Sequence, residues 1–154
     1  GAVTLREDPR VLPVGKFLRK TKINELPQFW DILIGNMSFV GPRPQMPVVV
    51  DKYPPEYLDV LKKVTPGVTG VGSIVFRDEE AIFSNAKDIE KCSLEEVIPY
   101  KLELEQWYAE HQSLFVDILL ILITIHAVLN SKSQLLLKVF PSIPFKDTSK
   151  FGQS

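Results

Sequence analysis

The chain has little of what marks several common classes of protein. Its single cysteine, Cys92, excludes an internal disulfide, and its two histidines, His111 and His126, have no cysteine or histidine at the spacing of zinc ligands. No basic stripe interleaved with aromatic residues is present, so nucleic acid is not an expected partner. The net charge is only -1. With 45% hydrophobic residues in a chain of 154, the sequence favours one globular domain with a real core.

Long apolar runs are also scarce. The one such run covers residues 114–129 and is broken only by Asp117, Thr124 and His126. It is too short for a membrane span, which needs about 20 residues. Both faces of the corresponding helix are apolar, so we expect the helix to be buried or to lie at a bilayer interface. The residues alone favour the buried helix.

The most informative segment, residues 19–44, combines cations, a carboxylate and a rigid turn. Thr21 is a candidate helix cap and Gly35 a candidate stop, and between them apolar residues recur at helical spacing: Ile23, Leu26, Phe29, Trp30 and Leu33. Asn24 and Glu25 then fall in the first turn. Unsatisfied backbone N–H groups and the helix dipole favour an anion there, either Glu25 itself or a bound phosphate.

A stiff turn, Gly41-Pro-Arg-Pro44, follows this helix. The two prolines restrict the backbone around Arg43, which would present its planar guanidinium in a fixed direction suited to bidentate phosphate recognition. On chemistry alone, an amphipathic helix with a basic rim and a proline-rich turn explains the same segment equally well.

The sequence of this segment closely resembles the signature of the bacterial sugar transferases, the monotopic phosphoglycosyl transferases. The match runs through Arg19, Thr21, Glu25, Leu26, Pro27, Gln28, Gly35, Met37, Ser38 and the turn at residues 41–44. Residues 65–70, with Arg77 beyond them, and residues 105–108 and 112–119 also resemble family segments. The resemblance covers roughly residues 8–129.

This resemblance implies an enzyme that transfers a sugar 1-phosphate from a nucleotide diphosphate sugar to polyprenyl phosphate, with Mg²⁺, as the first membrane step of exopolysaccharide, capsule or glycoconjugate synthesis. Family members use an adjacent Asp-Glu pair, in which the Asp forms a covalent phosphosugar intermediate. By resemblance, Glu25 and Asn24 are the catalytic candidates, and Glu25 is also the candidate Mg²⁺ ligand. Arg19, Arg43 and Arg77 are the candidate phosphate-binding residues.

The sequence departs from the family at the nucleophile, because Asn24 stands where the family has its Asp. A neutral carboxamide is a poor nucleophile. Three explanations remain open: Glu25 attacks directly, the reaction is a single displacement with Asn24 orienting the donor, or transfer activity has been lost. A non-catalytic binding module that keeps the phosphate pocket is therefore the alternative function, and a structural membrane scaffold is a third.

A second departure lies at residues 71–76, which replace the family's usual residues before Arg77 and predict a different sugar or nucleotide preference. The acidic residues that follow Arg77, at 78–80, predict a solvated helix start, with a Mg²⁺ site as the alternative.

We expect a mainly helical α+β domain with a short β-hairpin, rather than a Rossmann fold. Helices are predicted at residues 56–64 and 94–108, and a strand or hairpin at 70–76. The catalytic domain would cover residues 1–130 and a partly disordered tail residues 131–154.

The chain opens on Gly1 rather than methionine, and the family's upstream membrane hairpin has no counterpart in it, so we expect a fragment. The resemblance places the protein on the cytoplasmic face of a bacterial inner membrane and favours the interfacial position for the 114–129 helix. The expected partners are the nucleotide diphosphate sugar, polyprenyl phosphate, the membrane surface and a second copy in a homodimer.

Overall fold

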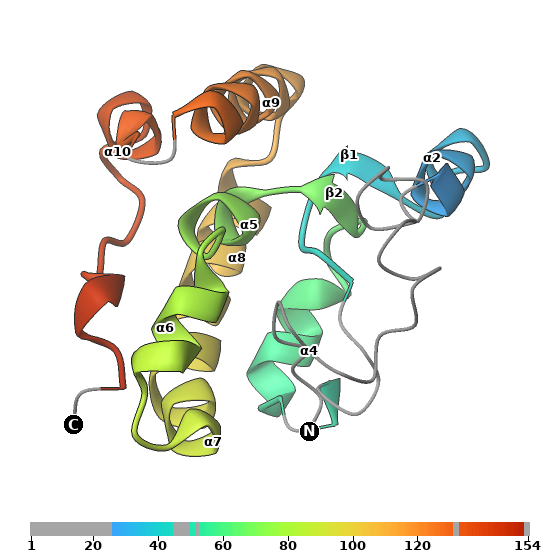
Figure 1. The fold of residues 1–154 in the computed structure, drawn as a ribbon. Helices are drawn as coiled ribbons and strands as arrows, with labels where there is room; N and C mark the ends of the chain where they lie inside the picture. Colours follow the sequence, from blue (N-terminus) through green and yellow to red (C-terminus); the bar gives the residue numbers. More distant parts are fainter. Residues whose placement is uncertain (1–25, 45–49, 52, 131–132, 153–154) are drawn as a thin grey trace, which may run out of the picture.

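A computed structural model describes residues 26–44, 50–51, 53–130 and 133–152 of the chain (Figure 1). The described part is mainly helical. Its elements in chain order are α2 (Leu26–Leu33), β1 (Ser38–Val40), α4 (Pro55–Leu61), β2 (Gly67–Thr69), α5 (Val71–Val75), α6 (Glu79–Asn85), α7 (Ile89–Cys92), a π-helical turn (Ser93–Val97), α8 (Ile98–His111), α9 (Leu114–Leu129), α10 (Leu135–Val139) and a 3₁₀ turn (Thr148–Lys150).

The two short strands of the described residues pair in parallel, with Ser38 opposite Gly67 and Val40 opposite Thr69. The mainly helical, non-Rossmann class is confirmed, but the predicted hairpin is wrong. Parallel strands need a crossover connection, and α4 lies in the segment that joins these two. Residues 71–75, expected to be strand, form α5, because burial of Val71 and Ile74 against the core outweighs their β-propensity.

The core is built around α8, which lies behind α5 and α6 in Figure 1. Tyr100, Leu104 and Tyr108 of α8 are almost completely buried, together with Val71 of α5 and Leu120 of α9. Burying these large side chains contributes about 1.5–3 kcal/mol each, and three of the five belong to α8. The helix predicted at residues 94–108 is confirmed as the π-helical turn followed by α8.

The predicted stop after the 21–33 helix is confirmed. Its described part, α2, ends at Leu33, and Gly35 follows with φ of 84°, a left-handed conformation that glycine adopts without steric cost. The predicted cap, Thr21, lies outside the described residues.

Residues 133–152 of the predicted tail pack against the rest of the chain. Leu136 and Ile143 are buried, the Tyr100 hydroxyl donates to the carbonyl of Pro144 (3.0 Å), and the backbone N–H of Gly152 donates to Glu96 (2.8 Å). These contacts join the described part of the segment to α8 and to the π-helical turn, and the partial disorder of residues 131–154 stays a prediction. A domain boundary at residue 130 stays a prediction.

Candidate functional site

The predicted site residues fall into two groups. Arg19, Asn24 and Glu25 lie outside the described residues, so their roles and the Mg²⁺ site assigned to Glu25 stay predictions. Arg43 and Arg77 are described, and they line two different pockets.

Arg43 sits in a turn that the parallel strand pair holds. The backbone N–H of Gly41 donates to the carbonyl of Thr69 (2.8 Å), and that of Gly67 donates to the carbonyl of Pro42 (2.9 Å). A side chain at Gly41 would collide with the carbonyl of Thr65, so the two backbones approach this closely only because the residue is glycine. The turn is therefore fixed at its base, and Arg43 leaves it as an exposed residue.

The pocket beside Arg43 has a volume of about 120 Å³. It combines aromatic walls with charges of both signs. Its lining residues are Arg43, Tyr57, Gly72, Ser73, Phe76, Glu79, Lys101 and Glu105. They come from five separate segments: the turn after β1, α4, α5 with the residue that follows it, α6, and α8.

Glu105 of α8 is the unusual member of this pocket. Glu105 is only 4% exposed. One of its carboxylate oxygens accepts a hydrogen bond from the backbone N–H of Gly72, and no described residue donates to the other oxygen, Oε2. Burial raises the pKa of this carboxyl to about 7, although Lys101 and the Gly72 N–H act in the opposite direction. A carboxyl that is buried without a complete set of donors is costly to maintain, which makes the position a candidate for function.

The lysine of this pocket already has partners. Lys101 Nζ lies 2.7 Å from Glu79 Oε1 and 5.1 Å from the centroid of the Phe76 ring. The pocket's carboxylates do not fit a Mg²⁺ site, because Glu79 is paired with Lys101 and the same lysine lies close enough to Glu105 to lower its pKa. No group of three or more metal-binding side chains gathers anywhere in the described residues. The acidic residues 78–80 instead begin α6, as the predicted helix start requires.

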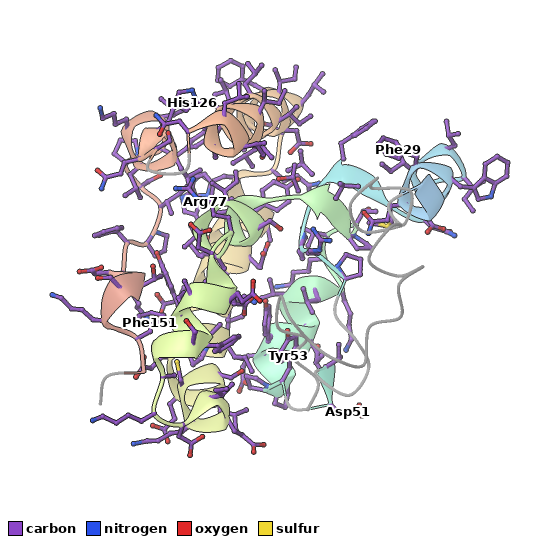
Figure 2. All side chains as sticks on the ribbon, viewed as in Figure 1. Phe29, Asp51, Tyr53, Arg77, His126 and Phe151 are labelled. Carbon is purple, nitrogen blue, oxygen red and sulfur yellow. The ribbon has the colours of Figure 1, made fainter. Side chains whose placement is uncertain are left out.

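Arg77 lies next to α5, in the region labelled in Figure 2. Its side chain lines a second pocket with residues of α5, α10 and the C-terminal segment, including Gln134, Phe145 and Lys146. Its Nε lies 3.6 Å from Asp78 Oδ2. The structure thus does not bring Arg77 into the pocket of Arg43, and its predicted phosphate role stays a prediction.

One side of α9 packs on the core through Leu120, Ile123 and Ala127, and two polar side chains of the helix bond to neighbouring elements. Asp117 accepts a hydrogen bond from the Tyr108 hydroxyl (2.8 Å), and the Thr124 hydroxyl bonds with that of Thr69 (2.7 Å). The outer face carries large exposed hydrophobic residues: Leu114, Phe115, Ile118, Leu122, Ile125, Val128 and Leu129. We call this set the α9 apolar face.

The α9 apolar face does not stand alone. Phe29, Trp30 and Leu33 of α2 and Phe39 of β1 are 52%, 65%, 78% and 53% exposed. Figure 1 shows α9, β1 and α2 along one edge of the molecule, and α9 packs on β1. Trp107 and Tyr108 are buried, whereas Trp30 is exposed. An exposed apolar surface of this extent marks an interaction surface.

Sequence reasoning missed Glu105, although a signal was present. Ile98, Lys101, Glu105 and Tyr108 follow one another at three- and four-residue spacing in α8, and Ile98 and Tyr108 are buried. Two charged residues between two core residues on one helical face predict a polar site inside the protein.

None of the helices in the described ranges is long and apolar enough to cross a bilayer.

In comparisons with known proteins, the family model described as bacterial sugar transferase matches residues 1–131. The chain is 38% identical over 128 residues to the galactosyl transferase CpsE of Streptococcus agalactiae, covering 81% of this chain and 24% of that protein.

Two further relatives show the same pattern. A UDP-galactose-lipid carrier transferase of Erwinia amylovora is 31% identical over 125 residues, covering 81% of this chain and 23% of the relative. A UDP-N-acetylgalactosamine-undecaprenyl-phosphate N-acetylgalactosaminephosphotransferase of Aeromonas hydrophila is 34% identical over 124 residues, covering 79% and 26%. The chain thus spans about a quarter of the length of these relatives. The match over residues 1–131 nevertheless includes the Arg43 turn, its pocket and the whole of α9, and the chain belongs to the bacterial sugar transferase family.

Proposed function

We propose that the protein transfers a sugar 1-phosphate from a nucleotide diphosphate sugar to polyprenyl phosphate, at the start of exopolysaccharide, capsule or glycoconjugate synthesis. The observation that carries this proposal is the family match over residues 1–131, which spans the sequence-predicted catalytic pair and the Arg43 turn. The names of the relatives supply the substrate classes, since they act on UDP-sugars and undecaprenyl phosphate or a lipid carrier.

The reaction has two displacements at one phosphorus atom. The Glu25 carboxylate attacks the sugar-bearing phosphorus, and the bond from that phosphorus to the nucleoside monophosphate breaks. A phosphate oxygen of the lipid then attacks the same phosphorus, and Glu25 leaves. Arg43 stabilises the negative charge on the transferring group. Mg²⁺ would be held through Glu25 and would neutralise charge on the diphosphate.

We place the protein at the cytoplasmic face of a bacterial inner membrane, with the α9 apolar face in the bilayer interface. Support for the interfacial position is independent of the family, since α9 packs on the core with Leu120 and Ile123 and still exposes the whole α9 apolar face. A helix that keeps a second, exposed apolar face gains free energy when that face enters the headgroup and acyl boundary. Homodimer formation stays a prediction.

We predict that Leu122→Asn combined with Ile125→Asn weakens binding to anionic phospholipid vesicles by at least about 10-fold, because two exposed apolar side chains no longer enter the interface. Flotation with vesicles measures the effect. The matched control replaces the exposed polar residues Ser84 and Gln106 with Asn. Equal flotation of both double variants and the unmodified protein would contradict the membrane role.

We predict that Arg43→Lys lowers kcat/KM for the donor by about 10–100-fold, because an ammonium keeps the charge but loses the planar pair of N–H donors. The measurement is the initial rate of transfer against donor concentration, with Lys62→Arg, an exposed cation of the α4 C-terminal turn, as control. An unchanged rate would mean that the turn is only structural.

Transfer of radiolabelled sugar from the aqueous donor into the organic-soluble lipid fraction, in vesicles with polyprenyl phosphate and Mg²⁺, tests the function itself. Label in the lipid that resists washing and is released as sugar phosphate by mild acid supports the proposal. The second candidate is a binding module without turnover, which Asn24 favours. That module would bind the donor and leave the lipid unlabelled.

A further inference from the structure

The Glu105 pocket has a feature that phosphate binding alone does not explain. A phosphate would be repelled by the carboxylate at its floor, yet Glu105 Oε2 has no donor among the described residues. This carboxylate oxygen therefore lacks the hydrogen-bond donor that a buried acceptor normally has.

The surroundings of Glu105 limit what that donor can be. Lys101 is held by Glu79 at 2.7 Å, and its charge is not directed at Oε2 by any hydrogen bond. Tyr57 and Phe76 supply aromatic walls, and Arg43 is exposed at the same pocket. The space of about 120 Å³ is several times what one water needs. A ligand that fits these surroundings is a ring with hydroxyl groups attached to a phosphate. A hydroxyl would donate to Glu105 Oε2, and the phosphate would lie near the Arg43 guanidinium.

Resting on the proposed function, we propose that this pocket is the subsite for a hydroxyl-bearing ring of the nucleotide diphosphate sugar, and that Glu105 Oε2 accepts a hydrogen bond from one of its hydroxyls. Gly72 completes the subsite, because its N–H holds the other carboxylate oxygen and a side chain there would collide with Oε1. Both the ribose and the transferred sugar carry such hydroxyls.

The pKa of Glu105, raised to about 7 by burial, agrees with this role. It shows that the groups already around the carboxyl do not compensate for its desolvation. A ligand hydroxyl would supply part of the missing stabilisation of the charged form.

The test is the affinity of the full chain for UDP-galactose, UDP and 2′,3′-dideoxyuridine diphosphate, measured by titration calorimetry on the unmodified protein, Glu105→Gln and Glu110→Gln. Glu105→Gln keeps the shape and an oxygen for the Gly72 N–H but turns an amide N–H₂ toward the ligand. We expect it to weaken UDP-galactose binding by about 10–100-fold, the effect of losing a hydrogen bond to a charged group. Glu110→Gln, an exposed change in the last turn of α8, should leave the affinity unchanged.

The three ligands identify the source of the hydroxyl. If UDP loses as much affinity as UDP-galactose while the dideoxy compound loses none, the hydroxyl belongs to the ribose. If only UDP-galactose loses affinity, it belongs to the sugar. Equal affinity of the unmodified protein and Glu105→Gln for all three ligands overturns the proposal, as does absence of any binding by the unmodified protein.

Failure of this inference differs from failure of the proposed function. Normal transfer with an unchanged KM in Glu105→Gln keeps the transferase and removes the subsite. If the unmodified protein shows no transfer and Glu105→Gln still binds UDP-galactose more weakly than it does, the subsite is kept and the transferase is removed. If Glu105→Gln does not fold, as judged by its circular dichroism, Ser73→Leu takes its place. This half-buried pocket residue would fill the space, and the same loss of affinity is expected.

Discussion

Replacing Glu25 with Gln is expected to lower kcat for sugar phosphate transfer by on the order of 10⁴-fold, the largest effect that we predict. Asn24 is uncharged, so Glu25 is the only ionised member of the pair that matches the family's catalytic dyad. A Gln side chain is neither a competent nucleophile nor a Mg²⁺ ligand of comparable strength. The change removes the role of Glu25 whether it attacks phosphorus itself or assists a single displacement.

The measurement is the single-turnover rate of label transfer at saturating donor, which separates chemistry from binding. Glu56→Gln is the matched control, because Glu56 is an exposed carboxylate in the first turn of α4. Turnover by Glu25→Gln within a few fold of the unmodified protein would remove Glu25 from the mechanism.

Replacing Gly41 with Ala is expected to lower the free energy of unfolding by about 3 kcal/mol or more. A Cβ there would collide with the carbonyl of Thr65 and approach the backbone N of Gly67 to 3.0 Å. Both obstacles are backbone atoms of the neighbouring strand segment, which rotamer changes cannot relieve. The strands would separate, and the Gly41 N–H bond to Thr69 would be lost.

Chemical denaturation monitored by tryptophan fluorescence measures this loss. Gly35→Ala is the control, because Gly35 has φ of 84° but no atom within 4 Å of the place that a Cβ would take, so only backbone strain of about 1–2 kcal/mol applies. Equal denaturation midpoints for the two variants would show that the strand contact at Gly41 contributes nothing beyond ordinary glycine strain.

The helices were predictable where their sequence periodicity was strong. The run at residues 114–129 forms α9 with those limits, because Ser113 caps its N-terminus and the apolar run ends before Asn130. Which way α9 faces depends on its partners, since nearly all its positions are apolar. The buried side of α9 is the one that carries Leu120 and Ile123, and Asp117 and Thr124 bond there to Tyr108 and Thr69 of other elements.

Long-range packing explains what the sequence did not reveal. The pairing of β1 with β2 depends on a glycine contact between residues 41 and 67, and the helical state of residues 71–75 depends on burial against α8 and α9. The family resemblance gives Arg43 and Arg77 the same predicted role, yet the fold directs them into different pockets. Glu105 belongs to the pocket because α5 places the backbone N–H of Gly72 within hydrogen-bonding distance of its carboxylate.

Release of nucleoside monophosphate is the measurement that tests transferase activity most directly. A panel of nucleotide diphosphate sugars is incubated with polyprenyl phosphate, Mg²⁺ and either the unmodified protein or Asn24→Asp. We expect the unmodified protein to release nucleoside monophosphate, with continued turnover that depends on polyprenyl phosphate. No release by the unmodified protein, together with release by Asn24→Asp, would show that the chain is a donor-binding relative of the enzymes and not a transferase.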